Sequence, residues 1–242
     1  MGYCIFLRKG ETHTTPSTGI LASDLAVGDI VKLTEGGTPV EYIVVNQGIP
    51  ENSSLYDSSC NGTWLLRKDC YDNDSWSDGN VNTYADSAVH TRLNEDFFNT
   101  FGNIEKTTIK QVKIPYCVGE DDATIRSGSN GLTTKIFLLG GYEVGFTTSD
   151  VGANLPVDGT KLNYFLLSSV SGSNDRRIAY YNGNATIWWL RSPDTNGSNY
   201  AFTVSRQGSY GTDYVSGART IRPALILPFT AKFDKDTKIL KG

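Results

Sequence analysis

The chain has 242 residues, of which 38% are hydrophobic and 20% charged, and its formal net charge is −4. This composition excludes a disordered chain and favours a folded protein with one large or two small domains. The acidic balance argues against binding driven by nucleic-acid phosphates, which needs clustered Lys and Arg. Apolar runs are too short to cross a bilayer, and the first residues do not have the pattern of a signal peptide.

The first third of the chain is predicted to be a lead-in followed by strands. Residues 1–20 are rich in Gly, Thr and Ser, so we expect an irregular segment or a linker. Runs of apolar β-forming residues then predict strands over 30–33, 40–45 and 63–68, with a turn at residues 36–37 between the first two.

The polar, acidic run 69–83 is predicted to be a loop and is the candidate for a bound calcium ion. With Asp74 as the first ligand, Trp76 and Ala85 fall where a helix–loop–helix calcium site needs oxygen ligands. That motif is therefore excluded, and only a looser calcium-bound or water-bound loop stays open.

The cysteines and histidines carry little evidence of chemistry. No two cysteines have the CxxC spacing of a zinc site, and two histidines leave little room for catalysis or for metal binding. Cys60 and Cys70 could form a disulfide in an oxidising medium, and the alternative is that all four thiols are free. His90 is interpreted as structural or solvated. We predict no metal and no cofactor.

The clearest helix is predicted over residues 86–101. Apolar side chains recur there every four residues, at Val89, Leu93 and Phe97, and form one apolar face. Ser87 or Asp86 can cap its first turn. The segment should therefore pack as a surface helix on the core.

Shorter elements are predicted after this helix. We expect a short helix or turn over 103–108, strands over 109–114 and 135–139, and either a strand or a helix over 162–167. Polar residues and glycines predict loops over 117–134 and 147–159.

Residues 180–228 have two apolar ends, which we expect to be structural. If the first end is a strand, Trp188 and Trp189 point to opposite faces, so that one ring enters the core and the other lines a surface. Arg191 can then stack on a ring or pair with a carboxylate. The predicted frame consists of Trp188, Trp189, Arg191, Pro193, Arg222 and Pro223.

Between these ends the chain is polar and rich in tyrosine. The composition predicts a loop over 194–200, a strand over 201–205 and a hairpin turn at Gln207-Gly208. Tyr offers a large contact area at low entropic cost, and Ser, Gly and Asn offer adaptable hydrogen bonds, as in antibody loops. The segment is interpreted either as a binding surface or as ordinary hydrophilic loops.

Catalysis is poorly supported by the motifs. The chain contains no GxSxG and no Gly-rich phosphate loop after a strand. Asp194 and Asp213 could act as the paired carboxylates of a glycosidase, but nothing in the sequence selects them. We therefore expect a protein that is not an enzyme.

Several motifs resemble one known family. In the C-terminal part, residues 188–193 read WWLRSP, Gly208 follows, and residues 221–225 read IRPAL. The first half of the chain contains the segments ASDLAVGDIVKL, VEYIVVNQG, SSLYDSSCNGTWLLRKD and IKQVKIPY. Over residues 22–228 these motifs resemble the DUF6273 family of Firmicutes and their prophages. That family is similar to the C-type-lectin-like fold of formylglycine-generating enzymes, phage tropism determinants and variable proteins of diversity-generating retroelements.

The resemblance implies an α+β, C-type-lectin-like fold, with a small, mostly antiparallel sheet, flanking helices and long ligand-facing loops. The order of the predicted elements also favours α+β. We expect one domain over residues 21–230, followed by a tail, 231–242, that is an exposed edge strand or a linker.

The resemblance to variable proteins implies a ligand surface at about residues 180–216. In those proteins the changes fall on polar and Tyr positions between a Trp-rich motif and an Arg-Pro motif. The residues with that placement here are Asn182, Asn184, Asp194, Asn196, Ser198, Asn199, Tyr200, Ser205, Ser209, Tyr210, Thr212, Asp213, Tyr214 and Ser216. The implied partner is a host cell-surface protein or glycan, the implied location is a phage virion or a bacterial cell surface, and a homo-oligomer is compatible with both.

Two other functions stay open at this point. One is an enzyme on a scaffold like that of the formylglycine-generating enzymes. Those enzymes use cysteines late in the chain, whereas no cysteine here follows Cys117, which weighs against that chemistry. The other is a structural module of a virion or cell surface, in which the polar loops would pack between subunits.

Overall fold

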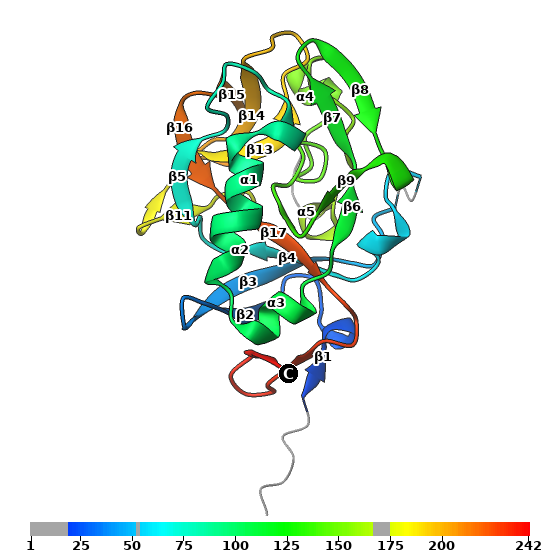
Figure 1. The fold of residues 1–242 in the computed structure, drawn as a ribbon, viewed down its shortest axis with the longest axis vertical. Coiled ribbons are helices and arrows are strands. Elements are labelled where there is room, and N and C mark those ends of the chain that lie inside the picture. Colours follow the sequence, from blue (N-terminus) through cyan, green and yellow to red (C-terminus); the bar gives the residue numbers. More distant parts are fainter. Residues whose placement is uncertain (1–18, 52–53, 167–174) are drawn as a thin grey trace, which may run out of the picture.

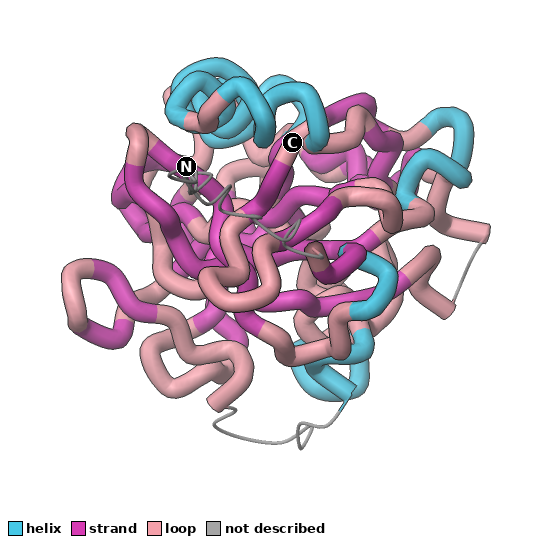
Figure 2. Tube along the Cα trace, turned by 90° about the horizontal axis from the view of Figure 1, so that it is seen from below, coloured by secondary structure: helices cyan, strands magenta, loops and turns pink. Residues whose placement is uncertain are grey.

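The computed structural model describes residues 19–51, 54–166 and 175–242. It has an α+β fold with mostly antiparallel strands, as predicted. Two five-stranded sheets form the centre, and short helices lie around them (Figures 1 and 2). All but the last two residues of the predicted lead-in, 1–20, lie outside the described residues.

The first sheet has the strand order β10-β17-β4-β3-β2, and its neighbouring pairs are antiparallel. The strands are β2 (Ile30–Glu35), β3 (Thr38–Gln47), β4 (Thr63–Arg67), β10 (Ile136–Phe137) and β17 (Ala224–Leu227). The strands predicted over 30–33, 40–45 and 63–68 are confirmed, because their apolar runs fill the core of this sheet. β17 pairs with β4, so the C-terminal apolar end completes a sheet that the N-terminal third begins.

The second sheet has the strand order β15-β14-β13-β16-β5 and comes mainly from the C-terminal third. Its strands are β5 (Asp72–Ser75), β13 (Trp188–Pro193), β14 (Tyr200–Val204), β15 (Tyr210–Tyr214) and β16 (Ala218–Ile221). Neighbouring pairs are antiparallel except β13 and β16, which share one parallel register pair between Trp188 and Thr220. In Figure 1 this sheet lies above the first.

Smaller strand groups border the two sheets. They are β6 (Val112–Ile114) with β9 (Leu132–Thr134), β7 (Tyr116–Gly119) with β8 (Asp122–Arg126), β11 (Tyr180–Tyr181) with β12 (Asn184–Ala185), and β1 (Ile20–Leu21) with β18 (Lys232–Phe233) and β19 (Leu240–Lys241).

Two predicted loops are wrong because polar segments form strands. Within 117–134, Glu120 and Asp121 have φ of 53° and 65° and make the two-residue turn that joins β7 to β8. Within 69–83, the polar strand β5 forms because its backbone pairs with β16. The strands predicted over 109–114 and 135–139 exist but are shorter, as β6 and β10.

The helices are short and lie at the surface (Figure 2). They are α1 (Ala88–Arg92), a π-helical segment (Leu93–Phe97), α2 (Phe98–Thr100), α3 (Asn103–Thr108), α4 (Thr148–Val151) and α5 (Asn163–Leu166). Turns of 3-10 helix span Ala22–Asp24, Ser58–Cys60, Tyr84–Asp86 and Gly128–Asn130. α4 lies inside the predicted loop 147–159. The segment 162–167, predicted as either strand or helix, is helical over α5.

The helix predicted over 86–101 is confirmed as the run from α1 to α2. Ser87 caps it, because its Oγ accepts a hydrogen bond from the His90 N–H at 3.2 Å. Val89, Leu93 and Phe97 are buried, so the predicted apolar face packs on the core.

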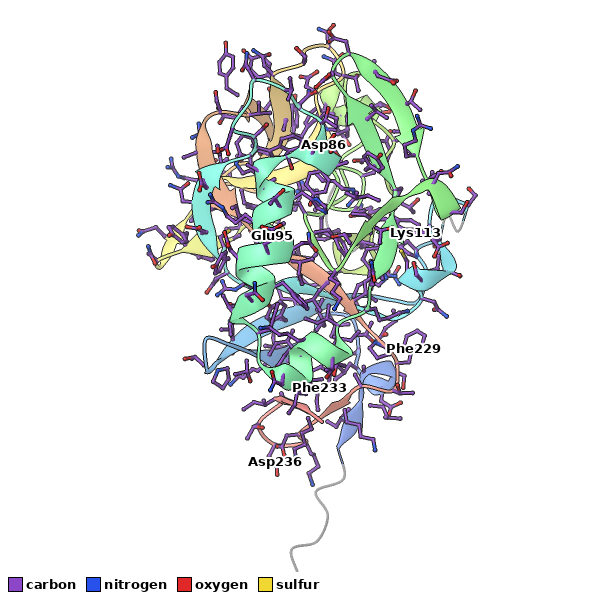
Figure 3. The ribbon with its side chains drawn as sticks, viewed as in Figure 1. Asp86, Glu95, Lys113, Phe229, Phe233 and Asp236 are labelled. Atoms are coloured by element: carbon purple, nitrogen blue, oxygen red, sulfur yellow. The ribbon has the colours of Figure 1, made fainter. Side chains whose placement is uncertain are left out.

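The predicted tail, 231–242, packs against the first sheet. β18 and β19 form a hairpin whose Phe233 and Leu240 side chains are buried. The Lys32 N–H of β2 donates to the Lys238 carbonyl at 2.8 Å, so the tail lies along the β2 edge. Figure 3 shows Phe233 and Asp236 at the lower end of the molecule.

Both tryptophans of β13 are fully buried, although one of them was expected to line a surface. That expectation is wrong because other segments cover both faces of the strand. The Trp188 Nε1–H donates to the Arg177 carbonyl at 2.9 Å, and the Trp189 Nε1–H donates to the Asp74 carbonyl at 3.0 Å. Each indole therefore has a hydrogen-bond partner inside the protein.

Cys60, Cys70 and Cys117 are buried free thiols. The alternative of a Cys60–Cys70 disulfide is therefore wrong. The Cys60 Sγ donates to the Lys113 carbonyl at 3.2 Å, whereas the Cys70 N–H donates to the carbonyl of Tyr180 in β11. Cys4 lies outside the described residues.

Candidate ligand-binding surface

Three tyrosines lie on one face of the β14–β15 hairpin, and we call them the tyrosine surface: Tyr200, Tyr210 and Tyr214. Tyr200 and Tyr214 are direct partners in the strand register. The centres of their rings lie 4.3 Å apart, and the ring planes make an angle of 34°. Tyr210 points to the same face as Tyr214, because side chains four residues apart in a strand do so. The exposed fractions of Tyr210 and Tyr214 are 47% and 51%, so both rings are open to solvent.

A hydrogen bond joins the hydroxyls of the stacked pair. This bond with Tyr214 raises the pKa of the Tyr200 hydroxyl above its ordinary value. Like any tyrosine at physiological pH, Tyr200 is neutral, so its hydroxyl can both donate and accept hydrogen bonds.

Buried groups support the hairpin from inside. The Phe146 ring meets the Tyr210 ring edge to face at 6.1 Å, and the Arg177 guanidinium lies 4.4 Å from the centre of the Phe146 ring. The Arg177 Nε–H also donates to the Gly208 carbonyl at 2.6 Å, in the turn that joins β14 to β15. The exposed Tyr210 ring therefore packs on buried side chains.

One buried side chain organises the loop between β13 and β14. The Asn82 Nδ2 group lies 3.0, 2.8 and 2.8 Å from the carbonyl oxygens of Asp194, Gly197 and Tyr200. The Asn82 Oδ1 accepts from the Glu120 N–H at 2.7 Å, which fixes the orientation of the amide. The loop backbone is therefore tied to the β7–β8 turn through a single residue.

A buried ion cluster holds β13 in place. The Arg191 guanidinium makes two hydrogen bonds with the Glu143 carboxylate, at 2.6 and 2.8 Å, and its other N–H groups donate to the carbonyls of Pro115, Leu138 and Asp158. All five of its donors are satisfied and the side chain is fully buried. Of the two roles expected for Arg191, pairing with a carboxylate is the one that the structure has.

Asp158 adds a second buried carboxylate to this cluster. Both of its side-chain oxygens lie 2.9 Å from the Ser192 Oγ, and Oδ2 lies 3.7 Å from the Arg191 Nε. Burial raises the pKa of Asp158 to about 6; Arg191 opposes this effect and the Glu143 carboxylate adds to it. The cluster is closed to solvent, so it is a structural support and not a site that a ligand can reach.

Arg222 supports the other end of the frame. Its guanidinium lies 5.1 Å from the centre of the Trp188 ring, and its Nε and Nη2 donate to the carbonyls of Arg67 and Lys68 at 2.9 and 3.0 Å. Among the described residues its Nη1 has no hydrogen-bond partner. The frame predicted from the sequence, including Pro193 and Pro223, is buried throughout.

None of the predicted ligand-binding residues is buried. The exposed ones are Asn182, Asn184, Asn196, Tyr210, Thr212, Tyr214 and Ser216. The half-buried ones are Asp194, Ser198, Asn199, Tyr200, Ser205, Ser209 and Asp213. The intervening strand β14 is buried from Ala201 to Val204, so the accessible surface is interrupted by core residues.

Several of these predicted residues have local structural roles. The Ser205 Oγ accepts from the N–H groups of Gln207 and Ser209 in the hairpin turn, at 3.3 and 3.1 Å. The Asp194 Oδ1 accepts from the Asn196 N–H at 2.9 Å, which closes the turn after β13. The hydrogen bonds within these turns are therefore enough to explain why a serine stands at 205 and an aspartate at 194.

The two candidate glycosidase carboxylates have different partners. The Asp213 Oδ2 lies 2.5 Å from the Arg219 Nε, in an ion pair that links β15 to β16. Asp194 instead closes its own turn. Each carboxylate therefore has a structural role of its own, and both lie close enough to Tyr200 to raise the pKa of its hydroxyl.

Asn182 and Asn184 lie on a separate hairpin. Asn182 has a φ of 50° and is followed by Gly183 at 77°, so the two residues form the turn between β11 and β12. A polar groove of about 450 Å³ lies beside this hairpin and is lined by Tyr181, Arg206 and Arg219, among others. Asn182 lines a different hollow, next to Arg67 and Lys68. The tyrosine surface is on β14 and β15, higher in Figure 1 than β11.

Sequence reasoning missed Asn82, Glu143, Asp158 and Arg177. Their main partners lie far away in the chain, and the side chains of Asn82 and Arg177 bind backbone carbonyls, which leaves no motif. The Asn182-Gly183 pair did carry a signal, because Asn-Gly is a strong marker of a two-residue hairpin turn. That signal predicts the β11–β12 turn and not a ligand contact.

No metal centre is visible in the described part of the chain, where no cluster of three or more His, Cys, Asp or Glu side chains could hold an ion. His90 is half-buried; burial lowers its pKa, and its Nε2 lies 3.3 Å from the Thr134 Oγ1. Among the described helices, none is both long and apolar enough to cross a membrane.

Comparison with known proteins identifies the family. Neither the curated proteins nor the solved structures contain a match to this chain. Residues 61–229 match the family model described as "Domain of unknown function (DUF6273)", and this span is more than half of the chain. It covers β4 to β17 and therefore includes the whole second sheet and the tyrosine surface. The chain belongs to the DUF6273 family.

Proposed function

We propose that this protein is a receptor-binding or adhesin-like protein, of phage or prophage origin, with a C-type-lectin-like fold. Its ligand-binding site is the tyrosine surface together with the polar residues beside it on the 194–200 loop and on β15. The ligand is a protein or a glycan on the surface of a bacterial host.

The observation that carries this proposal is the placement of three tyrosines on a rigid base. Tyr210 and Tyr214 are about half exposed, while the strands and side chains below them are buried. A tyrosine that is already held in place loses little conformational entropy on binding, and it offers both apolar area and a hydroxyl. Asn196, Ser198 and Asn199 lie on the loop that ends at Tyr200, are exposed or half-buried, and can supply hydrogen bonds.

The enzyme alternative has weaker support in the same structure. Burial raises the pKa of the Cys60 and Cys117 thiols to about 12, so neither is a thiolate at neutral pH. The thiolate is the reactive form, and a buried, protonated thiol is a poor nucleophile or metal ligand.

The test is to replace the three tyrosines by alanine, singly and together, and to measure binding of the labelled protein to a panel of bacterial cells. Truncation of a central interface tyrosine typically costs about 2 kcal/mol, so we expect each single change to weaken binding by about tenfold or more. Tyr180→Ala is the matched control, because Tyr180 is 46% exposed but lies on the β11–β12 hairpin.

Unchanged binding by the triple variant, with an intact fold by circular dichroism, would contradict the proposal. So would an equal loss of binding in Tyr180→Ala. Protease treatment of the cells, compared with periodate oxidation of their glycans, distinguishes a protein ligand from a glycan.

A further inference from the structure

β15 is the edge strand of the second sheet. It pairs with β14 over five residues, from Tyr200 with Tyr214 to Val204 with Tyr210, and it has no second neighbour in the described sheet. The register is continuous, without a bulge. β15 is therefore a regular strand with one free side.

Two hydrogen bonds at the ends of the hairpin show which residues face that free side. The Ser205 N–H donates to the Ser209 carbonyl at 2.7 Å, and the Val215 N–H donates to the Asn199 carbonyl at 3.0 Å. In an antiparallel pair, hydrogen-bonded and non-hydrogen-bonded positions alternate. Gly211 and Asp213 therefore bond to β14, and the backbone groups of positions 210, 212 and 214 point away from it.

These outward groups are open. Within the described residues, the Tyr214 carbonyl accepts from the Gly217 N–H at 2.8 Å. The other five have no hydrogen-bond partner there: the N–H groups of Tyr210, Thr212 and Tyr214 and the carbonyls of Tyr210 and Thr212. All three residues are exposed. Natural sheets usually guard such an edge with charged residues, with Pro or with a bulge. β15 has no Lys, Pro or bulge, and its one charged residue, Asp213, is paired with Arg219.

We propose that a second copy of this chain pairs with β15, strand to strand and antiparallel, about a two-fold axis at Thr212. The sequence Tyr-Gly-Thr-Asp-Tyr is nearly symmetric about that residue. Antiparallel pairing sets Thr212 opposite its own copy and Tyr210 opposite Tyr214 of the partner subunit. The open N–H groups of Thr212 and Tyr214 then meet open carbonyls, and the Tyr210 N–H meets the Tyr214 carbonyl of the partner subunit, whose second lone pair is available beside the Gly217 hydrogen bond. The facing tyrosines form the aromatic cross-strand pairs that stabilise sheets.

The pairing joins the two tyrosine surfaces. Residues directly opposite in an antiparallel pair have side chains on the same face of the sheet. Tyr210 therefore lies beside Tyr214 of the partner subunit. The tyrosines of both copies then form one continuous aromatic surface across the two-fold axis. This inference goes beyond the proposed function, since it concerns the assembled protein without any ligand.

Thr212→Pro tests the backbone contact directly. The Thr212 N–H points away from β14, so proline removes a donor at the two-fold axis without removing a bond inside the chain. Thr212→Ala is the matched control, because it changes the side chain and keeps the N–H. By sedimentation velocity over a concentration series, we expect the unmodified chain and Thr212→Ala to shift from monomer to dimer, and Thr212→Pro to stay monomeric.

A cysteine cross-link supplies a second test that does not depend on proline. Hydrogen-bonded antiparallel partners have Cα atoms about 5.5 Å apart, which a disulfide can bridge. In a Cys4→Ser background, Thr212→Cys should form a disulfide dimer under mild oxidation much faster than Thr124→Cys, on the exposed strand β8.

The proposal is overturned if the unmodified chain stays monomeric at the highest attainable concentration, if Thr212→Pro dimerises equally well, or if the two cysteine variants cross-link at the same rate. Loss of cell binding in the tyrosine variants leaves these results unaffected, so the two proposals fail separately.

Discussion

The buried carboxylate of Asp158 predicts an unusual dependence of stability on pH. Burial raises its pKa from the ordinary value of 3.8 to about 6, so the folded protein holds this proton more tightly than the unfolded chain does. The stabilisation is fully present below about pH 4 and is lost as the pH rises through 6. A shift of about two units, at 1.36 kcal/mol per unit, corresponds to about 3 kcal/mol of unfolding free energy.

Asp158→Asn mimics the protonated carboxyl at every pH and should remove this dependence. The measurement is the urea unfolding free energy of both proteins at several values between pH 4 and pH 7.5. We expect the variant to gain about 3 kcal/mol relative to the unmodified protein across that range, because only the latter must ionise a buried group. At the acid end the variant should be equally stable or slightly less stable, since its amide has one more hydrogen-bond donor to satisfy.

Asp236→Asn is the control for this experiment, because Asp236 is an exposed carboxylate on the C-terminal hairpin (Figure 3). Carboxylates outside the buried cluster titrate equally in both proteins, so the difference between the two profiles isolates Asp158 and its coupling to Glu143. A difference that stays constant within about 1 kcal/mol from pH 4 to pH 7.5 would refute the reasoning.

Two further predictions concern the interior. Asn82→Ala should lower the unfolding free energy by about 2–3 kcal/mol and increase amide hydrogen exchange over residues 194–200, because three carbonyls lose their shared donor; unchanged exchange in that loop would contradict the role given to Asn82. A second prediction concerns the thiols in a Cys4→Ser background. A thiol reagent at pH 8 should modify Cys60 and Cys117 only on unfolding. Their pKa of about 12 lowers the thiolate fraction by about a thousandfold relative to a thiol with the ordinary pKa of 9. Rapid labelling of the folded protein would show that these thiols are reachable.

Much of the fold could be predicted from the sequence where burial imposes a pattern. The strands β2, β3 and β4 and the helix that Ser87 caps have apolar residues at the required periods. β5 has no such pattern, because Asp72–Ser75 buries no side chain and is a strand only through its pairing with β16. A single sequence contains no record of that pairing.

The sequence indicated that the polar and Tyr residues between the two apolar ends lie at the surface, and it did not indicate what supports them. Composition indicated the tyrosine surface, since residue type alone shows which loops carry large amphipathic side chains. The partners of Arg191 could not be found in this way, because Glu143 lies 48 residues before it in the chain and Asp158 lies 33 residues before it. Contacts over such separations depend on the completed topology, which local patterns do not encode.

The Asn82 contact has a consequence for how the loop before β14 can evolve. The amide binds the main chain of residues 194, 197 and 200, and it touches none of the side chains of Asn196, Ser198 and Asn199 through these bonds. Substitutions at those three positions therefore leave the anchor of the loop intact. The side chains at these three positions can therefore change in evolution while the backbone of the loop keeps its path.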